Sequence, residues 1–146
     1  MNLVFGPATP ADYSEVRKIT REAYLHAGHF TADHPYLSVL DNVEHRAEHA
    51  EVWVAEASGA VVAAVTLTFA GRPYSEIAME NELELRVLAV DPAVQGNGVG
   101  RAVVRRGHQT CAVAARYPGD QHYERDVYGT GPCSLRILGL PEGSGP

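Results

Sequence analysis

The stretch that decides the fold is residues 82–101, ELELRVLAVDPAVQGNGVGR, in which an apolar segment runs into alternating glycines. Residues 82–90 predict a strand, and Pro92 helps to end it because proline cannot donate to a strand ladder. A helix is predicted from residue 100 to about residue 116. The stretch therefore predicts a strand, a glycine loop and a helix in succession.

The loop carries glycines at three alternate positions, Gly96, Gly98 and Gly100. Glycine lets the main chain approach a ligand closely and adopt dihedral angles that other residues avoid. The first turn of a helix leaves N–H groups unpaired, and its dipole favours an anion. We therefore expect pyrophosphate binding by main-chain donors, with a tight turn as the structural alternative. The spacing is neither a Rossmann fingerprint nor a P-loop, since no Lys-Ser or Lys-Thr follows.

The segments before this stretch complete a mixed pattern. They predict a short strand at 2–5, a helix that starts at Thr9-Pro10 and runs to about 26, a weaker helix at 37–50, and strands at 51–57 and 60–69. The last two strands form a hairpin around Ser58-Gly59. The fold class is therefore α/β (α+β), a mostly antiparallel central sheet flanked by helices, in a single domain over residues 1–146.

At this point the sequence resembles a family. Residues 95–100, QGNGVG, resemble the Gln/Arg-x-x-Gly-x-Gly/Ala signature of GNAT acetyltransferases, and residues 88–92, LAVDP, resemble the strand before it. Motif and element order extend the resemblance over residues 1–107. It implies an N-acetyltransferase that moves an acetyl group from acetyl-coenzyme A to a small-molecule or protein amine, by direct attack in a ternary complex.

The resemblance also implies where the cofactor binds. Main-chain groups of Leu88 and Val90 would pair with the pantetheine arm, the N–H groups of residues 99–101 would hold the pyrophosphate, and Gln95 stands at the loop entry. The full cofactor-binding set is Leu88, Val90, Gln95, Gly96, Asn97, Gly98, Val99, Gly100 and Arg101.

Glu84 is the candidate catalytic residue. Alternate residues from 82 to 90 share one face of an uninterrupted strand, which would place Glu84 two steps from Leu88 toward the acceptor. Family members often carry a carboxylate here, so Glu84 is a candidate base or substrate anchor. The alternative is an ion pair with Arg86 on a solvated face.

Other side chains suggest less. His45 and His49 match an HxxEH pattern, but the spacing offers no third ligand, so we expect no metal. Tyr24, Phe30 and Tyr36 either pack in the core and loops or line the acceptor pocket, because the family's first two helices cover that pocket.

The resemblance breaks after the cofactor helix. The family continues with a strand, a helix carrying a tyrosine and two closing strands, and nothing between residues 107 and 131 matches. An internal deletion and a natural minimal variant both remain open. The usual tyrosine acid has only stand-ins, Tyr117, Tyr123 and Tyr128.

The shortened closing segment would leave the sheet edge beside residues 85–90 uncovered, and exposed edges are normally paired or covered. We expect residues 134–140 to cover it, or a second chain to supply the strand in a homodimer. The same segment favours a second hypothesis, in which the chain is an impaired acetyltransferase that binds coenzyme A without turnover.

Composition bounds these hypotheses. The chain has 146 residues and a net charge of −6, which argues against nucleic acid as a partner because phosphate binding needs a basic face. No apolar run approaches the roughly 20 residues that span a bilayer. The N-terminus lacks the features of a signal peptide. We therefore expect a cytoplasmic protein without a membrane partner.

Overall fold

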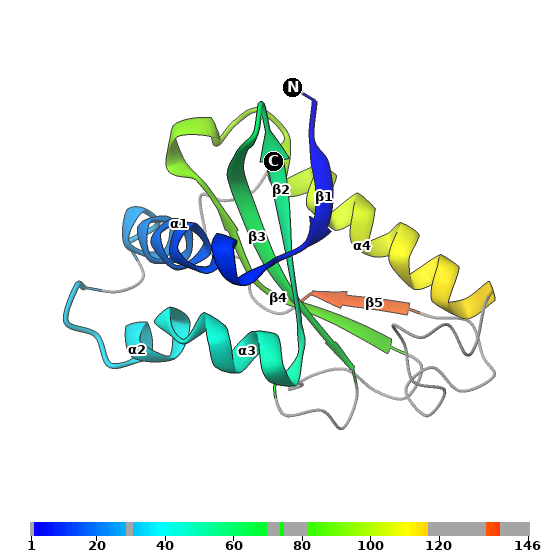
Figure 1. Cartoon of the computed structure of the whole chain (residues 1–146), viewed down its shortest axis with the longest axis horizontal. Helices are drawn as coiled ribbons and strands as arrows, with labels where there is room; N and C mark the ends of the chain where they lie inside the picture. The colour runs from blue at the N-terminus through cyan, green and yellow to red at the C-terminus, as the bar shows by residue number, and fades with distance from the viewer. Residues whose placement is uncertain (1, 29–30, 70–73, 75–81, 117–133, 138–146) are drawn as a thin grey trace.

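A computed structural model describes residues 2–28, 31–69, 74, 82–116 and 134–137. Its elements, in chain order, are β1 (Val4–Pro7), the 3-10 turn η1 (Pro10–Asp12), α1 (Tyr13–His26), α2 (Tyr36–Asp41), α3 (Val43–His49), β2 (Glu51–Ala57), β3 (Ala60–Phe69), β4 (Glu82–Val90), the 3-10 turn η2 (Pro92–Val94), α4 (Val99–Arg116) and β5 (Ser134–Ile137) (Figure 1).

The predicted helix over residues 37–50 is two helices, α2 and α3. Asn42 separates them with φ −84° and ψ 66°, outside the helical region, and its side-chain oxygen accepts a hydrogen bond from the His45 amide at 3.3 Å. Asparagine favours this N-cap position because its side chain satisfies an amide at the helix start. The chain therefore turns at Asn42 and begins a second helix.

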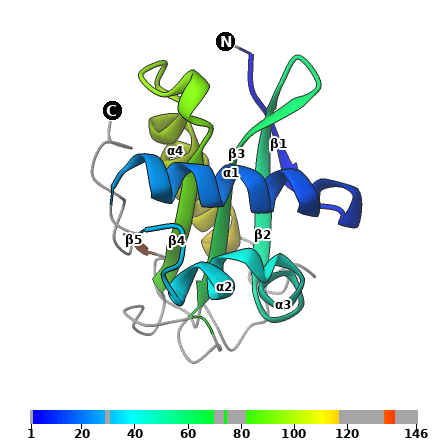
Figure 2. The same cartoon turned by 90° about the vertical axis from the view of Figure 1, so that its left-hand side faces the viewer.

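The sheet has five strands in the order β1-β2-β3-β4-β5. The first three pairings are antiparallel, and β4 pairs with β5 in parallel. Helices α1, α2 and α3 cover one face, and α4 covers the other (Figures 1 and 2). The predicted fold, a mostly antiparallel sheet flanked by helices, is confirmed.

Strand β4 contains a bulge at Val87. Opposite β3, Ala64 faces Ala89 while Thr66 faces Arg86, so β4 has one more residue than β3 in this interval. Val87 has φ +51°, which a β-branched residue rarely adopts. An extra residue of this kind bends a strand and interrupts its alternation.

The bulge overturns one prediction. Leu83 and Leu85, before it, share a hydrophobic cluster with Leu88 and Val90, after it. Glu84 alternates with Leu83 and Leu85 and therefore lies on the opposite face from the Leu88 and Val90 side chains. The prediction that alternate residues from 82 to 90 share a face is wrong, because it assumed an unbroken period of two.

Strand β5 covers part of the edge that the sequence left open. Its four residues pair with Glu82 to Leu85, from Glu82 opposite Ser134 to Leu85 opposite Ile137. The expected cover of residues 85–90 is met only at Leu85, because β5 pairs three residues earlier along β4 than expected. Residues 138–140 lie outside the described part of the chain. Within the described residues, β5 does not extend along residues 86–90 of β4.

The two faces of the sheet are packed by different helices. Helix α1 buries a stripe at helical spacing, Val16, Ile19, Thr20, Ala23 and Tyr24. Its start is held by Asp12, whose carboxylate accepts a bond from the Thr9 amide at 2.8 Å. On the other face, Val99 and Val103 of α4 join the cluster of β4. No helix in the described ranges is long and apolar enough to cross a membrane.

Candidate functional site

The segment between β4 and α4 begins as an anchored turn. The Asp91 amide donates to the Val62 carbonyl at 2.8 Å, which ties the end of β4 to β3. The Asp91 carboxylate accepts from the Ala93 amide at 3.0 Å, and the Val94 amide donates to the Asp91 carbonyl at 2.9 Å. These bonds fix the direction in which the chain enters the glycine loop.

Two glycines of the loop adopt left-handed conformations. Gly96 has φ +88° and Gly98 has φ +77°, and both are exposed. A Cβ added to either would meet no protein atom within 4 Å. Glycine is therefore needed here for its backbone conformation, and the space beside the turn is open to a ligand.

Side chains of the loop brace it from within. Gln95 Nε2 donates to the Val90 carbonyl at 3.3 Å, and Asn97 Nδ2 donates to the Val94 carbonyl at 2.9 Å. Gln95 thus ties the loop to the end of β4, and Asn97 ties it to the turn η2. These two bonds set the shape of the main chain in the loop.

Helix α4 presents its N-terminus at this loop. The Ala102 amide donates to the Gly98 carbonyl at 3.0 Å, so the amides of Val99, Gly100 and Arg101 belong to the first turn, where a helix offers no internal acceptor. Val99 is 2% exposed and packs with Leu88 and Val90 against the sheet. The first turn is thereby held rigidly next to the end of β4, as an anion site requires.

Glu84 lies on the other face of β4. Its side chain is completely buried, and its Oε2 is 3.9 Å from Arg86 Nη1. The expected ion pair with Arg86 therefore exists, but in the interior instead of on a solvated face. Arg86 also donates from Nη1 to the Tyr74 carbonyl and lies over the Tyr74 ring, 5.8 Å from its centroid.

Two tyrosines from α1 and α2 pack on this face of β4 beside Val87. Tyr24 is 8% exposed and packs with Leu37, Leu40 and Val87. Burial raises the pKa of Tyr24 to about 12, Tyr36 adds to the rise, and two arginines oppose it, so the Tyr24 hydroxyl keeps its proton at neutral pH. Tyr36 is half-buried in the same cluster, and Phe30 lies outside the described residues.

Arg46 is a member of this site that sequence reasoning missed. It is 2% exposed, in α3, and Tyr24, Tyr36, Tyr74 and Arg86 all affect its pKa, which burial lowers. Its spacing could have indicated its burial, because Arg46 follows Val43 by three residues and so lies on the same apolar face of the helix.

The histidine pair has a simpler explanation than metal binding. The rings of His45 and His49 are 4.4 Å apart, and His45 Nδ1 is 2.5 Å from the Tyr74 hydroxyl. Both histidines are exposed. No three His, Cys, Asp or Glu side chains come together as metal ligands in the part of the chain that the structure describes.

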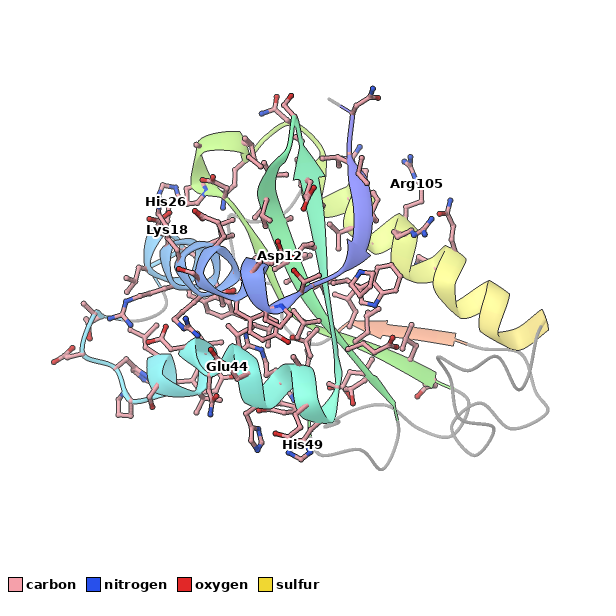
Figure 3. The ribbon with its side chains drawn as sticks, viewed as in Figure 1. Asp12, Lys18, His26, Glu44, His49 and Arg105 are labelled. Carbon is pink, nitrogen blue, oxygen red and sulfur yellow. The ribbon has the colours of Figure 1, made fainter. Side chains whose placement is uncertain are left out.

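A shallow groove of about 320 Å³ lies between α1 and the β2–β3 turn. Its charged lining consists of Lys18 and five acidic residues, Asp12, Glu15, Glu22, Glu56 and Asp91. Figure 3 labels Lys18 on α1 and Asp12 in the turn η1 that precedes it. Neither the glycine loop nor the Glu84–Arg86 pair lines this groove.

Known proteins share this architecture. The family model for the acetyltransferase (GNAT) family matches residues 13–112, more than half of the chain. No curated protein gives a significant match.

Solved structures resemble the fold at low sequence identity. A GNAT family acetyltransferase from Brucella melitensis in complex with acetyl-CoA is 23% identical, with 75% of this chain and 68% of that chain covered and a TM-score of 0.55. The PaiA N-acetyltransferase of Thermoplasma acidophilum in complex with coenzyme A is 14% identical, with 75% and 72% covered and a TM-score of 0.59.

A third structure covers more of the chain. A predicted acetyltransferase from Clostridium acetobutylicum with acetyl-CoA is 13% identical over 97% of this chain and 84% of that chain, with a TM-score of 0.61. The family model runs from the start of α1 into α4. It therefore includes the bulged strand, the glycine turn and the N-terminus of α4. The chain belongs to the GNAT family of acetyltransferases.

Proposed function

We propose that this protein is an N-acetyltransferase that uses acetyl-coenzyme A as acetyl donor and an amine as acceptor, by direct attack in a ternary complex. The observation that carries the proposal is the exposed turn at Gly96 and Gly98, which leads into the N-terminus of α4 beside the end of β4. Open space at both glycines and unpaired amides in the first helical turn suit a pyrophosphate.

Acetyl-CoA or coenzyme A is bound in the three similar structures, and the residues present here fit such a ligand. Main-chain groups of residues 96–101 would hold the pyrophosphate, in a loop shaped by Gln95 and Asn97. The main chain of Leu88 and Val90 would pair with the pantetheine arm along the end of β4, with which no residue of the described β5 pairs. The thioester supplies an activated acetyl group.

The protein must also take a proton from the acceptor, because an ammonium is not a nucleophile. Glu84 is the candidate for this task, directly or through water, or as an anchor for the amine. It is buried on the face covered by α1 and α2, and Arg86 is its charged neighbour. The bulge at Val87 lets one strand present Glu84 to this face while Leu88 and Val90 follow the other.

A second function is favoured by one observation. Glu84 is completely inaccessible to solvent and is paired with Arg86, an arrangement that also suits a purely structural carboxylate. On this reading the protein binds coenzyme A and does not turn over. The region in which the family's tyrosine acid would lie, residues 117–133, is outside the described residues.

Two measurements separate these functions. Thiol release from acetyl-CoA, followed with a mixed panel of amines, tests for turnover, and the shift of the melting temperature by coenzyme A tests for binding. A shift with amine-dependent thiol release supports the acetyltransferase. A shift without release supports the binding module, and the absence of a shift contradicts both.

A further inference from the structure

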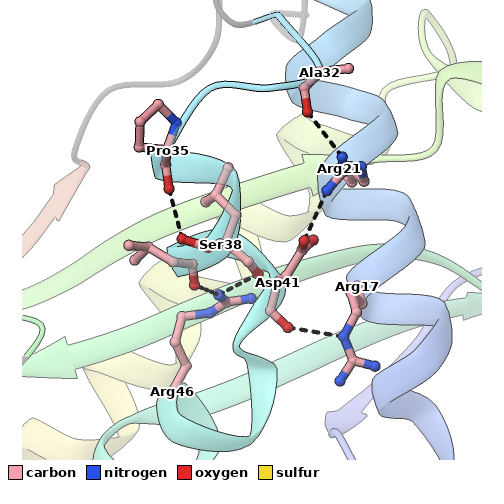
Figure 4. A network of polar contacts seen from close by, with 9 residues as sticks. Arg17, Arg21, Ala32, Pro35, Ser38, Asp41 and Arg46 are labelled. Carbon is pink, nitrogen blue, oxygen red and sulfur yellow. Dashed lines mark hydrogen bonds and ion pairs between the residues drawn. The ribbon is translucent and has the colours of Figure 1, made fainter.

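Arg46 is a buried cation that holds the end of a helix. Its Nη1 donates to the carbonyls of Val39, at 3.1 Å, and Leu40, at 2.7 Å, near the C-terminus of α2 (Figure 4). Its Nε is buried and has no hydrogen-bond acceptor among the described residues. The guanidinium carries five N–H donors, and the two bonds from Nη1 account for two of them. The N–H groups on Nε and Nη2 remain for other acceptors.

No carboxylate of the described residues neutralises the charge of Arg46. Two other arginines of this region have a carboxylate partner: Arg17 pairs with Glu44 at 2.5 Å, and Arg21 pairs with Asp41 at 2.8 Å. Among the described residues no acidic side chain pairs with Arg46, although it is far more deeply buried than either. Burying an arginine without a counter-charge is costly, which points to an anion that arrives with a ligand.

The surroundings of Arg46 place it in the candidate acceptor region. Its electrostatic neighbours are Tyr24, Tyr36, Tyr74 and Arg86, and Arg86 is the partner of Glu84. Tyr36 and Tyr74 are only half-buried, so the cluster reaches the surface through them. The guanidinium therefore lies on the same side of the sheet as the candidate base.

We propose that Arg46 binds a carboxylate carried by the acceptor, and that the acceptor is accordingly an amino acid or another amine with a nearby carboxylate. This inference rests on the proposed function. A carboxylate carries one negative charge, which would balance the positive charge of Arg46, and the planar arginine fork suits its two oxygens. Glu84, on the same face of β4, would then receive the amine end of a zwitterion. Arg46 would thus attract a negatively charged group locally, although the whole protein has a net charge of −6.

The test compares matched acceptors that differ only at the carboxylate. The twenty L-amino acids are each assayed against the corresponding carboxamide by thiol release from acetyl-CoA and by the melting shift that each compound causes. We expect at least one acid to exceed its amide by about tenfold or more in kcat/KM, because a charge-assisted bond is lost in the amide. A panel in which no acid exceeds its amide in either measurement overturns the inference.

Variants assign the preference to Arg46. Arg46→Gln should reduce the ratio of acid to amide toward one, mainly through KM, and Arg46→Lys should retain part of it because the charge remains without the fork. Arg17→Gln is the matched control, since Arg17 also bonds a carbonyl at the end of α2 but pairs with Glu44, and it should leave the ratio unchanged. If Arg46→Gln does not melt cooperatively, Arg46→Lys carries the test.

The results distinguish the inference from the function on which it rests. A preference that persists in both folded variants refutes the role of Arg46 and leaves the acetyltransferase intact. If no amine is acetylated, the proposed function fails, and the melting shifts still decide whether Arg46 recognises a carboxylate.

Discussion

The glycine loop and the polar cluster under α1–α3 are built in different ways. The loop takes its shape from consecutive residues, with left-handed backbone at Gly96 and Gly98 and helix amides just after them. The cluster brings together side chains from four elements, Tyr24 of α1, Tyr36 of α2, Arg46 of α3 and the Glu84–Arg86 pair of β4. Under the proposed function, main chain in the loop would hold the cofactor and side chains in the cluster would recognise the acceptor.

The largest expected effect tests the cluster as a site of chemistry. Glu84→Gln should lower kcat by about 100- to 10,000-fold if Glu84 is the base, while affinity for coenzyme A stays nearly constant. Glu56→Gln, at a half-buried glutamate of β2, is the control and should leave kcat unchanged. Steady-state kinetics and calorimetry measure the two quantities. Equal kcat values for the Glu84 variant and the parent protein would leave Glu84 a structural carboxylate.

The next prediction tests the loop. Gly98→Val should weaken coenzyme A binding by about a hundredfold, because a β-branched residue disfavours φ +77° and its side chain would occupy the space left for the ligand. Calorimetry with coenzyme A measures the change.

Gly59→Val is the matched control, since Gly59 has φ +80° and equally open surroundings in the β2–β3 turn. It should lose a similar amount of stability and keep its affinity. Undiminished affinity in a folded Gly98→Val protein would contradict the assignment of the loop.

A pH experiment tests the burial of the Tyr24 hydroxyl, a feature of the cluster that the exposed loop lacks. The pKa of Tyr24 is about 12 in the folded protein and about 10 when unfolded, so the folded state holds the proton more tightly. This contribution to stability is complete below pH 10 and is lost as the pH rises from about 10 to about 12.

The unfolding free energy of the parent protein should therefore fall more steeply over that range than that of Tyr24→Phe, by up to about 2–3 kcal/mol. Chemical denaturation at a series of pH values measures both slopes. Parallel slopes would show that the Tyr24 hydroxyl is not desolvated by folding.

The smallest effect concerns the helix pair that carries Arg46. Asn42→Ala removes the cap between α2 and α3 and should cost about 1 kcal/mol of unfolding free energy. Coenzyme A affinity should not change, because the loop lies on another part of the fold. Urea denaturation and calorimetry check the two statements, and a loss of coenzyme A affinity would show that the two regions are coupled.

Local features were the ones that could be predicted. The start of α1 near Thr9, the hairpin at Ser58-Gly59 and the order of strand, glycine loop and helix all appear in the structure. Each depends on residues close together in the chain, through caps, turns and backbone dihedral angles. The division of the second helix was missed, although Asn42 was visible as a capping residue.

Features of the cluster could not be predicted in the same way. The face to which Glu84 points depends on the bulge at Val87, which exists because of how β4 pairs with β3. The burial of Arg46 depends on the packing of α3 against its neighbours, and the sequence offered only its spacing of three residues from Val43 as a signal. The pairing of β5 with Glu82 to Leu85 likewise joins segments far apart in the chain.

The sequence by itself determined the family and the loop that the cofactor would use, because a turn with φ near +80° at two glycines and a helix start are written in consecutive residues. Only the tertiary structure decided which side chains meet on the face covered by α1, α2 and α3. Long-range packing and strand register set those positions, and one extra residue in β4 was enough to reverse the face of every side chain beyond it.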